Sequence, residues 1–142
     1  MANSTDLLAA AQVAITASAA LVKASQTLVD NAHDQMTATP PTLTLDAYRS
    51  LVNHHAAVIG NAATIRQITA LDLGARIKDD TAALRATTET LSADIAKLGQ
   101  IQNVVDVAAR VLVAAGALAT LAATPSLMTA DAVVSAISAI WS

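Results

Sequence analysis

Apolar residues recur every seven positions along most of this chain, with polar residues between them, which is the pattern of long amphipathic helices. The first helix is predicted from about Asp6 to about Gln35. A neighbouring helix is expected to enter the shallow groove beside its apolar stripe. Two adjacent heptad rows define this stripe: Leu7, Ala14, Leu21, Leu28 and Leu8, Ile15, Val22, Val29.

The segment 37–44 is the clear linker of the chain, because two prolines and four threonines do not continue a helix. Thr44 is expected to cap a second helix, with Asp46 in the first turn, where the helix dipole favours an anion. This helix is expected to end near residues 72–74. Its core row is again apolar at heptad spacing: Leu51, Val58 and Ile65.

A third apolar row continues through Gly99 without interruption: Ile77, Leu84, Leu91, Leu98, Val105, Leu112 and Ala119. In a continuous helix an apolar row has to keep its heptad phase to stay on one face, whereas a turn at Gly99 would remove this requirement. We therefore predict one helix from about Ala75 to about Ala123, about 70 Å long at about 1.5 Å per residue. The alternative is that Gly99 ends a helix after Lys97 and the chain folds back into a compact bundle.

The last part of the chain is predicted to be an apolar helical hairpin over about residues 104–142. The segment 124–126 interrupts the preceding helix, and a short final helix is expected over residues 132–141. From Val111 to the end of the sequence, Asp131 is the only charged residue. A helix that is apolar on all sides is either buried on all sides or in contact with lipid.

Composition supports an all-α fold. Hydrophobic residues make up 54% of the 142 residues, yet about a quarter of the chain is alanine and there is no Phe. Alanine is the best helix former, and a core of small side chains reaches native packing density only when helix axes approach closely. The chain is therefore predicted to be a single domain, residues 1–142: an antiparallel bundle of about four to five long, alanine-rich amphipathic helices with a short C-terminal helix.

The sequence offers little for catalysis or for binding a cofactor or metal. His54 and His55 are adjacent, so they point about 100° apart on a helix, and a lone Asp30–His33 pair is weak as a metal site. There is no Cys, Glu89 is the only Glu, and the glycines are isolated rather than grouped in a phosphate-binding loop. The net charge of -3 and the pI near 5.4 argue against nucleic-acid binding. We expect no enzymatic activity, no cofactor and no nucleic-acid partner.

The functional prediction depends on the apolar C-terminal region. We expect a non-enzymatic protein with a structural or assembly role that self-associates into a homo-oligomer. The alternative is a membrane-inserting, pore-forming or permeabilising protein, in which the Trp141 indole would lie at the membrane interface. A helical protein partner is compatible with the same patterns. The predicted self-association or membrane-contact residues are all apolar: Val104, Val105, Val111, Leu112, Leu118, Leu121, Val133, Ile137, Ile140 and Trp141.

The N-terminal residues lack the basic start of a secretory signal. The apolar run that follows contains Lys23 and has the pattern of an amphipathic helix. We therefore expect a cytoplasmic protein, although unconventional secretion is compatible with the same sequence.

Overall fold

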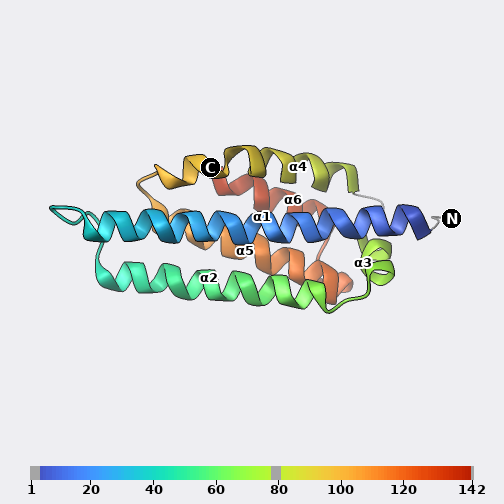
Figure 1. The fold of residues 1–142 in the computed structure, drawn as a ribbon. Helices are drawn as coiled ribbons and strands as arrows, with labels where there is room; N and C mark the ends of the chain where they lie inside the picture. The colour runs from blue at the N-terminus through green and yellow to red at the C-terminus, as the bar shows by residue number, and fades with distance from the viewer. Residues whose placement is uncertain (1–3, 78–80, 142) are drawn as a thin grey trace.

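Six α-helices form the bundle in the computed structural model, which describes residues 4–77 and 81–141 (Figure 1). The helices are α1 (Ser4–Thr37), α2 (Leu45–Arg66), α3 (Ala70–Ile77), α4 (Thr81–Asp94), α5 (Val104–Ala123) and α6 (Ala130–Ser138). Short 3₁₀ segments follow α4, α5 and α6: Ile95–Gly99, Pro125–Leu127 and Ala139–Trp141. The described residues include no strand, which confirms the all-α class.

Helix α1 runs through the middle of the bundle, with α2 on one side, α4 on the other and α5 behind it (Figure 1). Its buried stripe consists mainly of small residues, and Ala14, Ala17 and Ala24 are completely buried. Small side chains let the axes of neighbouring helices come close. Many van der Waals contacts between the helices then fill the space that larger side chains would otherwise fill. The buried hydroxyls of Ser18 and Ser25 each donate to the carbonyl three residues earlier, which satisfies them inside the helix.

Helix α2 begins directly after the predicted linker, and Thr44 caps it: its Oγ1 accepts a backbone N–H of the first turn at 3.1 Å. The helix ends at Arg66, so the prediction that it continues to residues 72–74 is wrong. Thr69 starts a separate helix instead, because its Oγ1 accepts a backbone N–H of α3 at 3.4 Å. The new helix changes direction and lies beside the N-terminal part of α1 (Figure 1).

The contact between α3 and α1 is made at Gly74. A Cβ atom built on Gly74 would lie 1.9 Å from the carbonyl oxygen of Leu7, far inside the van der Waals distance. Leu73 and Ile77 flank this contact and are each 1% exposed. Only a residue without a side chain lets the two backbones approach so closely.

The prediction of one continuous helix from Ala75 to Ala123 is wrong, and the compact alternative is correct in placing a break at Gly99. The phase of the apolar row also changes there. Its first four members are buried, but Val105 is 37% exposed. The core row of α5 is displaced by one residue and consists of Val104, Val111 and Leu118.

The break is stabilised from α1 and not by a left-handed glycine, since Gly99 has no positive φ. Asn31 is buried, and its Nδ2 donates to the carbonyl oxygens of Leu98 at 2.8 Å and of Ile101 at 2.9 Å. Gln35 Nε2 donates to the Ile101 carbonyl oxygen at 3.1 Å and to Asn31 Oδ1 at 2.9 Å. These amides satisfy carbonyl groups that a helix end leaves without partners.

The C-terminal hairpin is present much as predicted. Helix α5 lies against α1, α2 and α6, and α6 lies against α4 and α5. Thr129 caps α6 by accepting the N–H of Ala132 at 3.2 Å, so this helix begins slightly earlier than expected. The 3₁₀ segment Ala139–Trp141 completes the final helical stretch.

Candidate functional site

Most of the predicted C-terminal contact residues lie inside the chain's own core. Their side chains pack on neighbouring helices of the same bundle, so they form no external surface in this structure. The seven buried members are Val104, Val111, Leu118, Leu121, Val133, Ile137 and Ile140. Their role in self-association or membrane contact stays a prediction and requires the bundle to open.

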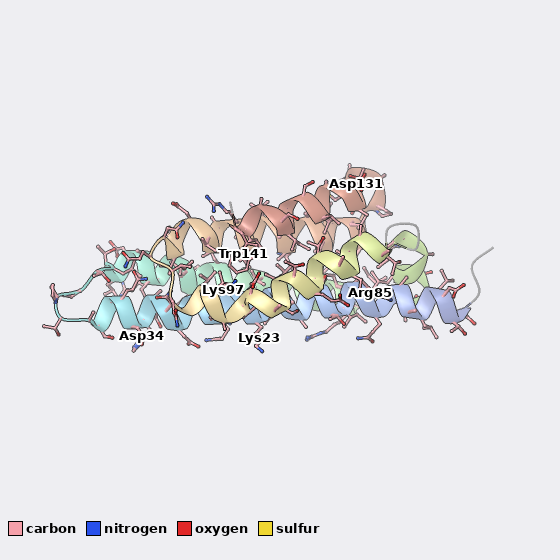
Figure 2. All side chains as sticks on the ribbon, turned by 90° about the horizontal axis from the view of Figure 1, so that it is seen from above. Lys23, Asp34, Arg85, Lys97, Asp131 and Trp141 are labelled. Atoms are coloured by element: carbon pink, nitrogen blue, oxygen red, sulfur yellow. The ribbon has the colours of Figure 1, made fainter. Side chains whose placement is uncertain are left out.

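The other three reach the surface. Val105 is 37% exposed, Trp141 is 38% exposed and Leu112 is partly exposed. Val113, which was not among the predicted residues, is 64% exposed and borders a shallow hollow of about 180 Å³ between α5 and the C-terminal segment. Trp141 lies near the middle of the bundle in Figure 2, where it lines a groove between α4 and α6.

A longer apolar surface follows α2. Leu45, Val52 and Ile59 are seven residues apart and are 50%, 39% and 46% exposed. These three residues and the exposed residues between them follow one another at spacings of four and three positions in turn. Together they form one stripe along the helix. We call this stripe the α2 row, and all of its members are exposed: Leu45, Arg49, Val52, Ala56, Ile59, Ala63 and Arg66.

The α2 row was not among the predicted contact residues, although the sequence contains a signal for it. The row of Leu51, Val58 and Ile65 accounts for the buried face of α2, and each member is at most 1% exposed. A second heptad row follows it by one residue, so it lies about 100° away around the helix. Helix α2 packs against α1 and α5, and among the described residues its second row stays exposed.

The outer faces of α1 and α4 are mostly polar. Along α1, most exposed positions carry amide, hydroxyl or charged groups, Leu8 is an exposed large hydrophobic residue, and Lys23 and Asp34 lie along the outer side in Figure 2. Along α4, Arg85, Glu89 and Ser92 are exposed. The α2 row differs from these two faces, whereas α5 also exposes two large apolar side chains, Val105 and Val113.

Two contacts fix the level of α2 against α1. Ser25 Oγ and His55 Nδ1 share a hydrogen bond, and the rings of His33 and Tyr48 meet edge to face with centroids 5.9 Å apart. In each pair, the residue number on α1 and the residue number on α2 sum to about 80. Residues of the two helices whose numbers have this sum lie level with each other, so two valines on α1 are level with members of the α2 row. These are Val22, level with Ile59, and Val29, level with Val52. Both are partly buried and pack against the hydrophobic core.

A groove of about 320 Å³ lies between α1 and α4 and has polar side chains from both helices in its lining. Gln12 and Thr16 line it from α1, and Arg85 and Glu89 line it from α4. Gln12 and Thr16 already hydrogen-bond to each other at 3.2 Å. In residues 4–77 and 81–141, no three His, Asp or Glu side chains gather where they could hold a metal ion.

Two of the described helices, α1 and α5, are long and apolar enough to cross a bilayer by length and composition. Half of the most apolar stretch of each is buried inside the bundle. Core helices of soluble proteins share these properties, so this observation is weak evidence for a membrane protein.

Comparison of the chain with protein-family models, with curated proteins and with solved structures found no match.

Proposed function

We propose that this chain is a non-enzymatic helical protein with an assembly role, and that it self-associates through the α2 row. The observation that carries the proposal is the exposure of Leu45, Val52 and Ile59 on one stripe. Contiguous exposed apolar surface on a small protein is typical of an interaction site. The heptad spacing of the stripe fits another helix, because apolar rows of this period pack into the grooves of a neighbouring helix.

The size of the apolar gain indicates a weak complex. Burying a Val, Leu or Ile side chain completely is worth about 1.5–3 kcal/mol, so a half-buried one gains roughly 1 kcal/mol more. Three such side chains on each of two copies contribute roughly 6 kcal/mol. Association costs about 4–15 kcal/mol in lost freedom of motion. We therefore expect association that depends strongly on protein concentration.

The double substitution Val52→Lys with Ile59→Lys should remove this association. Each lysine would place a charge in the contact, and the apparent dissociation constant should rise by about a hundredfold or more because buried charges without partners are strongly unfavourable. Sedimentation velocity over roughly 10 μM to 1 mM covers the range of weak association. Circular dichroism would check that the helical content is unchanged.

Leu71→Lys is the matched control. Leu71 is 48% exposed on α3, away from the α2 row, so its replacement should leave the dissociation constant unchanged. A wild-type chain that sediments as a monomer over the whole concentration range would refute the proposal. Equal weakening by both variants would show that general surface hydrophobicity, and not the α2 row, causes association.

Membrane insertion of the C-terminal hairpin is the second candidate function. It is favoured by the 20-residue length of α5, which matches the thickness of a bilayer core, and by the exposure of Val113 at its surface. Insertion would require α5 and α6 to leave the bundle, since half of the most apolar stretch of α5 is buried.

Trp141 is the only tryptophan and reports on this second candidate directly. Under the self-association proposal, vesicles of zwitterionic or anionic phospholipid should leave its emission maximum unchanged. Insertion would move the indole into an apolar environment and shift the emission to the blue, together with release of a trapped dye. That result would favour the membrane function over assembly in solution.

A further inference from the structure

The α2 row is nearly symmetric about its midpoint, between His55 and Ala56. Reversing the direction of the helix exchanges Val52 with Ile59 and Leu45 with Arg66, because each pair lies at equal distances from that midpoint. When two copies of α2 lie antiparallel, Val52 of one copy therefore meets Ile59 of the other, whereas Leu45 meets Arg66. This self-complementarity is what an isologous two-fold contact needs, and a row adapted to an unrelated partner has no need of it.

The charges of α2 distinguish the two possible orientations. Apart from the histidines, its charged residues are Asp46, Arg49 and Arg66, and all three are exposed. In a parallel pair, Arg49 would lie beside Arg49 of the second copy and Arg66 beside Arg66 of the second copy, and both contacts are repulsive. An antiparallel pair brings the last turn, with Arg66, beside the first turn of the second copy, with Asp46. In the antiparallel pair the two helix dipoles also point in opposite directions.

Small residues give the antiparallel pair room to approach. In that arrangement Arg49 lies near the level of Ala63 of the second copy, and Ala56 lies near the level of its own counterpart. Gly60 borders the same stripe, and a Cβ built on it would have no atom within 4 Å. A close approach of the two axes therefore meets no large side chain at the middle of the row.

We infer that the α2 row is the contact surface for a second copy of this chain, which docks with its α2 antiparallel about a two-fold axis near Ala56. This inference rests on the proposed function and specifies its partner and orientation. A helix pair about 33 Å long and about 10 Å wide covers less area than a permanent interface. The expected species is therefore a reversible dimer.

Disulfide cross-linking tests the orientation cleanly, because the chain has no cysteine of its own. The variants are Val52→Cys, Ile59→Cys and Ala56→Cys, each as a single substitution in the full chain. In the antiparallel dimer, two copies of residue 52 lie about 10 Å apart along the axis, too far for a disulfide. Residues 52 and 59 of different copies lie level with each other.

The experiment mixes Val52→Cys with mass-tagged Ile59→Cys under a mild oxidant and separates the products on a non-reducing gel. The mixed 52–59 disulfide should form about tenfold faster than the 52–52 disulfide, given the strict geometry of the bond. Ala56→Cys should cross-link to itself. Ser92→Cys, on the exposed face of α4, is the matched control and should give only the background rate.

The outcomes separate the two proposals. Fast 52–52 cross-linking together with cross-linked Ala56→Cys would overturn the antiparallel orientation and leave self-association intact. Background rates in all variants, with a dimer still seen by light scattering, would show that a different surface makes the contact. Background rates together with a monomer by light scattering would overturn the proposed function as well.

Discussion

Replacing Gly74 by alanine should lower the free energy of unfolding by about 3 kcal/mol, at the upper end of what overpacking usually costs. The added Cβ would lie 1.9 Å from the Leu7 carbonyl oxygen, and the nearest atoms all belong to the backbone of α1. A flexible side chain could rotate away from the new methyl group, whereas a helix backbone cannot. The whole of α3 has to move, and the burial of Leu73 and Ile77 is lost in part.

Gly60→Ala is the matched control, because Gly60 lies inside α2 with no atom near its would-be Cβ. Alanine is a better helix former than glycine, so this change should stabilise the fold by about 0.5–1 kcal/mol. Urea unfolding followed by circular dichroism, at concentrations low enough to keep the chain monomeric, measures both variants. Equal stability of the Gly74 variant and the wild type would contradict the close contact between α3 and α1.

Replacing Asn31 by alanine should cost about 2–3 kcal/mol, since a buried carbonyl left without its donor carries its full desolvation penalty. Asn31 is the only recorded side-chain donor to the Leu98 carbonyl oxygen within the described residues, whereas Ile101 would keep its bond from Gln35. The connection between α4 and α5 should therefore loosen on the Leu98 side.

Trp141 offers a local readout of that loosening. It lines the same small hollow as Leu98 and Ile101, so its emission should shift to the red in the Asn31 variant. Gln12→Ala is the control on the same helix, because the amide of Gln12 is exposed and bonds only to Thr16 among the recorded contacts. It should change stability by less than about 0.5 kcal/mol. Equal effects of the two variants would mean that Asn31 does not hold the break.

Local patterns were sufficient to predict the helices whose limits depend on nearby residues. The heptad rows of α1 and the Pro40-Pro41 pair determine where the first helix runs and where it must stop. Thr44 and Thr129 cap the following helices with their own side chains, so these starts are encoded locally as well. The all-α class follows from the same signals together with the alanine content.

The choice between one continuous helix and a break at Gly99 could not be made in this way, because the main support of the break lies elsewhere in the chain. In the sequence the apolar row keeps its heptad spacing past Gly99, which was the basis of the wrong prediction, whereas in the folded chain the buried row shifts by one residue there. The side chain that satisfies the Leu98 carbonyl belongs to Asn31, which is 67 residues earlier in the sequence. No periodicity within residues 75–123 contains that information.

The predicted contact residues and the α2 row differ in how far the sequence indicates them. Sequence patterning pointed to ten residues of the C-terminal region, and seven of them are buried in the chain's own core, where Val133, Ile137 and Ile140 pack within the bundle. The α2 row was visible in the sequence only as a second heptad row, Leu45, Val52 and Ile59. Its exposure depends on which helices pack around α2, and the spacing within one helix does not contain that information.

The central position of α1 has a consequence for how the chain acquires its structure. During synthesis α1 emerges before every helix against which it packs, and its small-residue stripe is covered only in part until α4 and α5 have been made. Helical bundles usually fold fast because their contacts are local in sequence. Here the contacts of α1 with α4 and α5 close long loops, so folding should be slow for an all-α protein. Helix pairing between nascent chains, through stripes that are still open, would compete with it.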